Sequence, residues 1–395
     1  MAFSHGILPM SLLALAAFAF QPVGALAAQQ PLKIGFVAEL SGPQGALGQD
    51  QYDGFMLVVE RNGGKLGGHP VQILKEDSKL KPDVGVQVVQ KLMERDHVPI
   101  ITGITFSNIM MAVHKLITDN EVFLVGSNAG PSPIAGAACS PYQFIVSWQQ
   151  DDLAEVLGEY SNQQGYKRVY LMAPNFQAGK DFLAGIKRTF KGEVVKEVYT
   201  PLNQPDFSAE LTQLAAAKPD AVFVFYPGGL GVNFVRQYQQ AGLMQDIPLM
   251  SGGIADATVL AALRESALGI KGSFPWGPDL QNDANRAFVA EFEKKYKRIP
   301  SPFAANGYDS AQLLDSAIAK VNGDVADKKA FMAALKAADF ASVRGDFAFG
   351  PNHFPIQDYH VQQVVKDDAG RINIRTIATP FKSRSDSYAS QCPLN

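Results

Sequence analysis

The chain has 395 residues, 47% of them hydrophobic and 18% charged, which is enough for two or three domains of ordinary size. Its formal net charge is −3, so it lacks the basic excess with which a nucleic-acid binder neutralises phosphates. Its two Cys and six His form no C-x-x-C, H-x-H or H-E-x-x-H motif, which argues against a zinc or iron–sulfur site made of protein side chains.

The N-terminal segment is predicted to be a secretory signal. Ile7–Phe20 form an apolar run shorter than the ~20 residues that span a bilayer. Ala25 and Ala27 then supply the small-x-small pattern that signal peptidase accepts. We expect residues 1–27 to be removed and the mature chain to be exported. Because no Lys or Arg precedes the apolar run, a buried N-terminal helix stays the alternative.

Export to an oxidising compartment bears on whether the two cysteines form a disulfide. Cys139 and Cys392 both lie in the mature part, and an even pair in an oxidising compartment usually forms a disulfide. Such a bridge would fix a C-terminal tail that otherwise frays. Two free buried thiols are the alternative.

Short apolar runs alternate with helical patterns from Lys33 onward. Several runs are rich in Val and Ile without alternation, as in strands buried on both faces of a parallel sheet. The predicted strands are Lys33–Ala38, Val71–Lys75, Val98–Gly103, Val122–Gly126, Arg168–Ala173, Val194–Tyr199, Ala221–Tyr226, Pro248–Met250, Gly269–Phe274, Val343–Phe349, Tyr359–Lys366 and Ile372–Ile377. Helices are predicted at Gln49–Arg61, Asp83–Arg95, Phe288–Tyr296 and Ala311–Val321. Strand–helix–strand repetition indicates an open α/β sheet.

The strand–helix series occurs twice, which predicts two similar α/β lobes. The expected lobes are residues 28–147 with 277–351, and residues 148–276 with 352–395. The chain would cross between them near Ser147–Trp148, Phe274–Pro278 and Gly350–Pro355. Several crossings make a hinge, and a hinge implies a cleft. Ligands of open α/β sheets bind beyond the carboxyl ends of the strands, so the loops there are the candidate site.

Two loops of the first lobe suit an anion. One ends in Phe106, Ser107 and Asn108 before the predicted helix Ile109–Thr118, and either polar residue could cap that helix. The next predicted strand is followed by Ser127, Asn128 and Ala129. Helix N-termini and hydroxyl-bearing loops can hold a carboxylate without an arginine. A simple helix cap is the alternative role of Ser107.

Aromatic residues follow strands or lie at the first crossing. Phe106, Trp148, Phe176 and Tyr226 could form the walls of an apolar slot, although core packing would explain each of them singly. The glycines at 42, 45 and 48 do not form a G-x-G-x-x-G motif, which disfavours a dinucleotide cofactor. G-x-S-x-G is absent, and no His has a local nucleophile and acid. We therefore predict no catalytic residue, metal or cofactor.

The chain resembles the periplasmic solute-binding proteins of the branched-chain amino acid type (type I), which serve ABC importers. The resemblance spans about Leu32 to Thr379. It rests on Ile34-Gly35-Phe36 before Ser41-Gly42-Pro43, Gly48, Asn62-Gly63-Gly64, Gly67-Gly68, Asp77 with Pro82, Gly179-Lys180-Asp181-Phe182 and Asn306-Gly307-Tyr308-Asp309. The family implies two Rossmann-like lobes, a three-segment hinge and closure on a small ligand. It also implies delivery to a membrane permease without chemistry, by a chain that we expect to be a monomer.

The family's amino acid binders hold the ligand carboxylate with residues that match Ser107 and the Ser127–Ala129 loop. They hold the ammonium with an acid in a second-lobe loop, which here ends in Ile254 and has none. Asp256 is the one acid nearby and could instead cap a helix. A buried ammonium without a partner would cost several kcal/mol.

A kept carboxylate site, a lost ammonium site and added aromatic walls point to an aromatic carboxylate. The runs Thr105–Asn108, Ser147–Gln149 and Ala173–Phe176, and the two cysteines, resemble the subset that binds benzoate-like and cinnamate-like acids. Three alternatives stay open. The chain could bind an aliphatic amino acid through Asp256, act as a receptor module for a sensor, or be a secreted enzyme whose site assembles in space.

Overall fold

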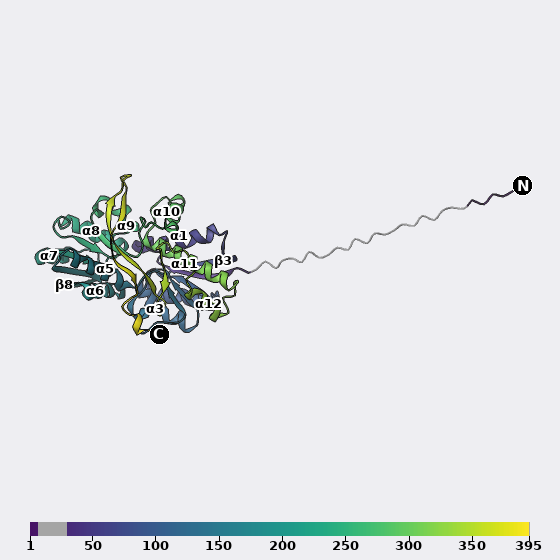
Figure 1. Cartoon of the computed structure of the whole chain (residues 1–395), viewed down its shortest axis with the longest axis horizontal. Helices are drawn as coiled ribbons and strands as arrows, with labels where there is room; N and C mark the ends of the chain where they lie inside the picture. Colours follow the sequence, from purple (N-terminus) through teal and green to yellow (C-terminus); the bar gives the residue numbers. More distant parts are fainter. Residues whose placement is uncertain (7–29, 395) are drawn as a thin grey trace. The chain divides into compact units, whose positions relative to one another are not determined.

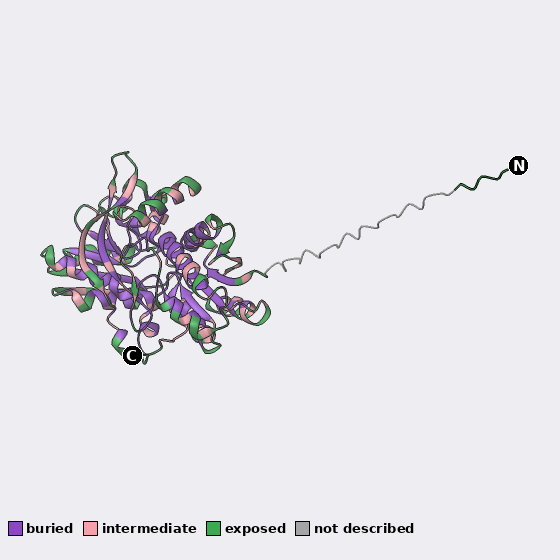
Figure 2. Ribbon diagram, turned by 45° about the vertical axis from the view of Figure 1, so that its right-hand side comes forward, coloured by how far each residue is buried: buried purple, intermediate pink, exposed green. Residues whose placement is uncertain are grey.

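The computed structural model describes residues 1–6 and 30–394, and the predicted signal segment lies almost wholly outside them. The compact unit that begins at Pro31 contains two sheets, each covered by helices. Helices α5–α9 gather around one sheet, whereas α1, α10, α11 and α12 surround the other (Figure 1). Central strands of both sheets, such as β4, β5 and β9, are wholly buried, while exposed residues lie on the outer helices and loops (Figure 2).

The first sheet has the order β2-β3-β1-β4-β5-β6 and is parallel except for the β2–β3 pair. Its strands are β1 Leu32–Ala38, β2 Lys65–Leu66, β3 His69–Asp77, β4 Ile100–Gly103, β5 Phe123–Gly126 and β6 Gln143–Ile145. The helices around it are α1 Gly45–Arg61, α2 Pro82–Gln90, α3 Ser107–Asp119, α4 Ser132–Ala135, α10 Asp283–Tyr296, α11 Pro302–Lys320 and α12 Lys328–Lys336. Its central strands are buried on both faces, as their unbroken apolar runs predict.

The second sheet has the order β12-β13-β11-β10-β9-β7-β8, and β14 also pairs with β13. Its strands are β7 Arg168–Pro174, β8 Glu193–Thr200, β9 Ala221–Val224, β10 Leu249–Ser251, β11 Lys271–Phe274, β12 Ala348–Phe349, β13 Pro355–Lys366 and β14 Ile372–Arg384. Its helices are α5 Gln150–Gln163, α6 Gln177–Thr189, α7 Ser208–Ala217, α8 Gly228–Gln240 and α9 Ala257–Leu263. No helix among the described residues is long and apolar enough to cross a membrane.

The predicted strand Val343–Phe349 is wrong over most of its length. Only Ala348–Phe349 form a strand, and they pair with β13 on the edge of the second sheet, although the predicted first lobe extends to residue 351. The buried carboxylate of Asp309 accepts hydrogen bonds from Ser342 Oγ (2.6 Å) and from the backbone N–H of Val343 (3.1 Å). These bonds hold the segment in a turn.

Arg344 connects the first lobe to two segments that cross between the lobes. Its guanidinium is buried and donates to Asp309 Oδ2 at 2.9 Å. It also donates to the carbonyl oxygens of Val146 (2.6 Å) and Ser147 (2.9 Å) and to Gln357 Oε1 (2.8 Å). One side chain therefore fixes the start of the first crossing against the end of the third.

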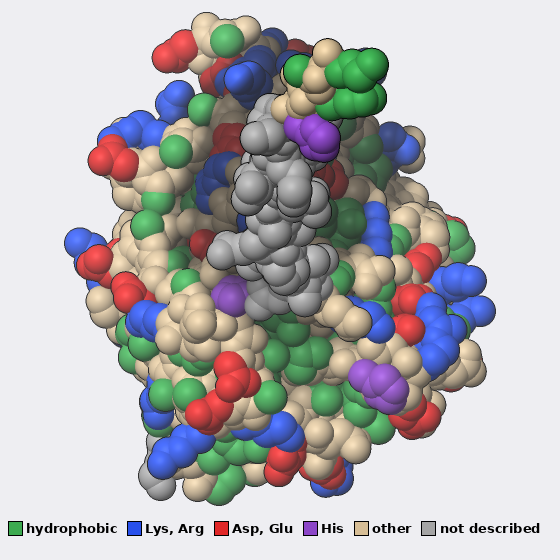
Figure 3. Space-filling model, turned by 90° about the vertical axis from the view of Figure 1, so that its right-hand side faces the viewer, with side chains coloured by type: hydrophobic (Ala, Val, Ile, Leu, Met, Phe, Trp, Pro, Cys, Tyr) green, Lys and Arg blue, Asp and Glu red, His purple; other side chains and the backbone are tan. Residues whose placement is uncertain are grey.

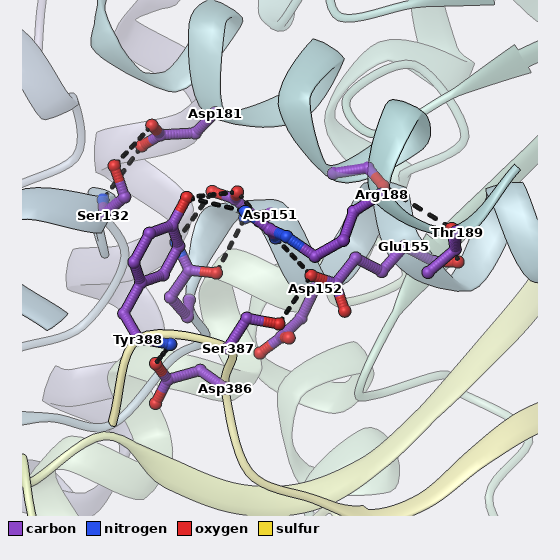
Figure 4. Close-up of polar contacts among 12 residues, drawn as sticks. Ser132, Asp151, Asp152, Glu155, Asp181, Arg188, Thr189, Asp386, Ser387 and Tyr388 are labelled. Carbon is purple, nitrogen blue, oxygen red and sulfur yellow. Dashed lines mark hydrogen bonds and ion pairs between the residues drawn. The ribbon is translucent and has the colours of Figure 1, made fainter. Parts of the chain in front are cut away.

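The Cys139–Cys392 disulfide is present, so that prediction is confirmed. It joins the C-terminal tail, which follows β14, to the segment between α4 and β6. Side chains hold the same tail against α5 and α6, as Tyr388 Oη donates to Asp151 (2.8 Å) and Ser387 Oγ donates to Glu155 (2.8 Å) (Figure 4). Arg188 of α6 forms an ion pair with Asp151 at 3.0 Å in this cluster.

Candidate ligand-binding cavity

A cavity lies where loops of both lobes meet, beyond the carboxyl ends of strands from the two sheets. Its volume is about 420 Å³. Its lining residues are Leu47, Thr105, Phe106, Ser107, Asn128, Ala129, Trp148, Gln150, Leu153, Phe176, Ala178, Phe225, Pro227, Gly252, Gly253 and Phe303.

Aromatic rings form the walls of this cavity. Phe176 lies between Phe106 and Phe225, with centroid distances of 6.3 and 6.1 Å. Trp148 and Phe303 lie 6.2 Å apart, centroid to centroid. Such spacing is typical of rings in contact, and flat apolar walls favour a flat apolar ligand.

Two helix N-termini open towards the cavity. Helix α3 begins at Ser107 and α6 at Gln177, and neither N-cap residue, Phe106 or Phe176, caps its helix with its side chain. In α6, one first-turn N–H, that of Ala178, already donates to a side chain of the other lobe. The first-turn N–H groups of a helix lack partners within it and favour negative charge. The structure thus supplies two anion-favouring ends, one from each lobe, without a fixed cation.

Ser107 connects the lobes as well as lining the cavity. Its Oγ accepts a hydrogen bond from the backbone N–H of Ala178 at 2.9 Å. Because a hydroxyl both accepts and donates, the Ser107 proton stays available for a further acceptor. The predicted cap role is wrong in detail, since Phe106 occupies the N-cap position and Ser107 is the first helical residue.

Two buried amide groups on the wall carry an atom without a hydrogen-bond partner. Asn128 is 8% exposed, and its Nδ2 donates to the carbonyl oxygen of Thr105 at 2.5 Å, while its Oδ1 has no partner. Gln150 is 6% exposed, and its Nε2 has no partner. Buried polar atoms are normally satisfied, so each of them requires an explanation.

Every lining side chain is uncharged. One buried acid, Glu39, lies behind the wall, where its backbone N–H donates to Thr105 Oγ1 (3.4 Å) and its carboxylate accepts from Ser78 Oγ (2.5 Å). Burial raises the pKa of Glu39 to about 7. Such a group is a poor fixed partner for an ammonium at neutral pH.

The cavity brings together six of the predicted site residues, namely Phe106, Ser107, Asn128, Ala129, Trp148 and Phe176. Asn108, Ser127, Tyr226, Ile254 and Asp256 are not among its lining residues. Ser127 Oγ instead accepts from Gln51 Nε2 at 2.7 Å. Ile254 is fully buried among the apolar residues around α8 and α9.

Tyr226 belongs to the core of the second lobe. Its ring lies 5.0 Å from those of both Phe207 and Phe234, centroid to centroid, and its hydroxyl pairs with Thr200 at 3.3 Å. The preceding residue, Phe225, lines the cavity in its place.

Asp256 caps α9. Its Oδ1 accepts from the backbone N–H of Thr258 at 2.8 Å, and the residue is fully buried. Burial raises the pKa of Asp256 to about 7. The structure places this acid in the alternative role that the sequence allowed, away from the cavity wall.

Sequence reasoning missed several lining residues. Phe303 comes from the start of α11, and Gly252 and Gly253 follow β10. Gln150 and Leu153 lie on α5, directly after the first crossing. Among the missed residues, Gly252 and Gly253 carried a visible signal, because they lie in the second-lobe loop that ends in Ile254. Ala178 also carried one, because it comes two residues after Phe176.

A second contact joins the lobes beside the cavity. Asp181 of α6 accepts from the backbone N–H of Ser132 (3.0 Å) and from Ser132 Oγ (2.7 Å), and Ser132 begins α4 of the first lobe. Gln177 Nε2 donates to the same carboxylate at 2.8 Å. Figure 4 shows Asp181 directed at Ser132.

A larger, more open groove of about 1460 Å³ lies between α1, α9 and the end of α10. Its wall includes charged residues that pair with one another, such as Arg298 with Asp50. Figure 3 shows basic and acidic side chains interspersed on one face of the molecule. Among residues 1–6 and 30–394, no three His, Cys, Asp or Glu side chains are arranged to hold a metal ion.

Comparisons with known proteins bear on the family and the fold of the chain. Residues 31–370 match the model of a periplasmic binding protein family. A protein of Brucella melitensis named Leu/Ile/Val-binding protein homolog 6 is 27% identical over 390 residues, covering 95% of this chain and 98% of its own length.

Solved structures are similar over nearly the whole chain. An ABC transporter solute-binding protein of R. palustris in complex with benzoate is 32% identical, with a TM-score of 0.87 over 92% of this chain and 99% of the other. One from Rhodopseudomonas palustris in complex with 3,4-dihydroxybenzoic acid is 28% identical, with a TM-score of 0.83 over 90% of this chain and 99% of the other. With its two α/β lobes and its matched length, the chain belongs to the periplasmic binding protein family and has the type I fold.

Proposed function

We propose that this protein binds a small aromatic carboxylate between its lobes and delivers it to the membrane permease of an ABC importer. The observation that carries the proposal is the cavity wall, which combines five aromatic side chains with the N-termini of two helices and no charged side chain. Rings stack on the walls, and the helix ends stabilise a carboxylate. We also propose that residues 1–27 are removed and that the mature chain acts in the periplasm as a monomer. It catalyses no reaction on its ligand.

The similar structures support the ligand class. One is in complex with benzoate, one with 3,4-dihydroxybenzoic acid and one with 4-hydroxybenzoate. The Brucella relative's name favours a second candidate, a branched-chain amino acid. Its ammonium would need an acid that the cavity wall lacks, and Asp256 already caps α9.

A matched ligand pair separates the two candidates. 3-Phenylpropionate and phenylalanine differ by one ammonium group, and benzoate and leucine extend the comparison. Titration of refolded, ligand-free protein should change the fluorescence of Trp148, which lines the cavity. We expect the acids to bind and the amino acids not to bind. Binding of the amino acids alone would refute the proposal, and ligand recovered chemically altered would refute the non-catalytic role.

Two variants test the roles of Ser107 and Asp256 in ligand binding. Ser107→Ala removes a donor to the carboxylate and should weaken binding by about 1–3 kcal/mol, or 5- to 150-fold. Asp256→Asn keeps a cap oxygen for Thr258 and should leave the affinity for the acids unchanged. Unchanged affinity in Ser107→Ala would remove Ser107 from the site. Leucine binding by the wild type that is lost in Asp256→Asn would favour the amino acid.

A further inference from the structure

The orientation of the Asn128 side chain is fixed by its own hydrogen bond. Nδ2 donates to the carbonyl oxygen of Thr105, which can only accept. The other end of the amide is therefore the acceptor Oδ1, and it is buried without a partner in a residue that lines the cavity. A carboxylate cannot satisfy this atom, because an ionised carboxylate has no proton to donate.

Gln150 supplies the complementary group. It is 6% exposed and lines the cavity, and its Nε2 is buried without an acceptor. The wall thus offers one unused acceptor from the first lobe and one unused donor from the start of α5. An unsubstituted aromatic acid could use the donor alone, and binding would leave Asn128 Oδ1 buried and unpaired.

We propose that the ligand is an aromatic acid with a ring hydroxyl, and that this hydroxyl donates to Asn128 Oδ1 while Gln150 Nε2 donates to a ligand oxygen. The inference rests on the proposed function and narrows it from aromatic acids to phenolic acids. A phenolic hydroxyl satisfies an acceptor with its proton and keeps lone pairs for a donor. A site that hydrogen-bonds a ligand hydroxyl discriminates strongly against the analogue that lacks it.

An ammonium could also donate to Asn128 Oδ1. A single neutral amide oxygen does not balance a buried positive charge, however, and the lining carries no carboxylate. A phenol brings a donor without a charge, so it fits the wall better.

The test is isothermal titration of the mature, ligand-free protein with benzoate, the three hydroxybenzoates, 3,4-dihydroxybenzoate and the matching methoxybenzoates. A methoxy group keeps an oxygen acceptor but has no proton to donate. We expect at least one hydroxylated acid to bind about 10- to 100-fold more tightly than benzoate and than its methoxy analogue. Equal affinities for benzoate and all hydroxybenzoates would overturn the inference and leave the proposed function standing. Failure of every acid to bind, or binding of phenylalanine in their place, would overturn both.

Two variants test whether Asn128 causes the preference for a hydroxylated ligand. Asn128→Leu removes the acceptor at similar volume and should reduce the hydroxyl preference to less than about threefold while benzoate still binds. Asn108→Leu is the matched control, because Asn108 Oδ1 is also buried without a partner but lies off the cavity wall. It should keep the full preference. If Asn128→Leu still prefers the hydroxylated acid, the role of Asn128 is overturned. If that variant fails to fold, the ligand series on the wild type still decides the ligand class.

Discussion

The contact between Asp181 and Ser132 predicts how affinity depends on a residue outside the cavity. Asp181 of α6 accepts from both the backbone N–H and the hydroxyl of Ser132, which belongs to the other lobe. The contact exists only while the lobes are together. Asp181→Ala should therefore destabilise the closed arrangement and leave each lobe intact.

The magnitude follows from the two bonds. A hydrogen bond to a charged group contributes about 1.5–3 kcal/mol, and a buried N–H left without an acceptor costs about 1–3 kcal/mol. Desolvation of the carboxylate offsets part of this gain, so we expect a net loss of about 1–3 kcal/mol in ligand binding. That loss corresponds to a 5- to 150-fold rise in Kd, expressed mainly as faster dissociation, because the contact forms on closure.

The assay is stopped-flow tryptophan fluorescence with benzoate, together with denaturant unfolding of the ligand-free protein. Asp220→Asn is the matched control, since Asp220 accepts from two backbone N–H groups, of Lys167 and Arg168, within one lobe. It should lower stability without changing the dissociation rate. Ser132→Ala combined with Asp181→Ala should cost less than the sum of the single changes. An unchanged dissociation rate in Asp181→Ala, or strict additivity, would refute the reasoning.

Three further predictions concern stability. Arg344→Met should cost about 3–5 kcal/mol in urea unfolding, because it leaves the buried Asp309 carboxylate without its cation, and a loss below 1 kcal/mol would contradict this. Replacing both cysteines by serine should cost about 2–5 kcal/mol, since the disulfide closes a loop with a sequence separation of 253, and an unchanged Tm would show that the tail is held without it. His353 is buried and its pKa is lowered to about 4, so its neutral form stabilises the fold above pH 6.5 and that contribution is lost as the pH falls towards 4. When the pH falls from 7.5 to 5, His353→Asn should therefore lose about 2 kcal/mol less stability than the wild type. Equal losses would exclude His353 as a contributor. Asn is chosen because it tolerates the positive φ of 58° at this position.

The sequence predicted the α/β fold because unbroken apolar runs such as those at β4 and β5 are typical of strands covered on both faces, and it predicted two lobes because the strand–helix series occurs twice. It failed at Val343–Phe349, where Gly345 takes a positive φ of 90° and the Val343 backbone donates to Asp309, a residue 34 positions earlier. A contact over that distance leaves no local pattern. The disulfide was predicted only from the even number of cysteines and the oxidising compartment, and it is present.

Part of the candidate site could also be predicted from the sequence, and part of it could not. Loops after strands were the correct place to look, and six of the eleven proposed residues line the cavity. The choice of Tyr226 over Phe225 failed because neighbouring residues at a strand end point to opposite faces. Ala221, Phe223 and Phe225 share one core cluster, whereas Val222, Val224 and Tyr226 share another. Phe303 was missed because it does not follow a strand. It lies at the start of α11, three residues before the family motif Asn306-Gly307-Tyr308-Asp309, which by itself indicates no ligand contact.

The disulfide also affects how the protein survives proteolysis. A single backbone cut anywhere between Cys139 and Cys392 leaves both pieces covalently joined, because the bridge closes that whole stretch into a ring. The ring includes all of α5–α12 and all three segments that cross between the lobes. In a compartment where exported proteins meet proteases, one cut in an exposed loop there would leave a nicked molecule whose fragments stay together and can keep their packing. Only the stretch before Cys139 and the few residues after Cys392 lack this protection.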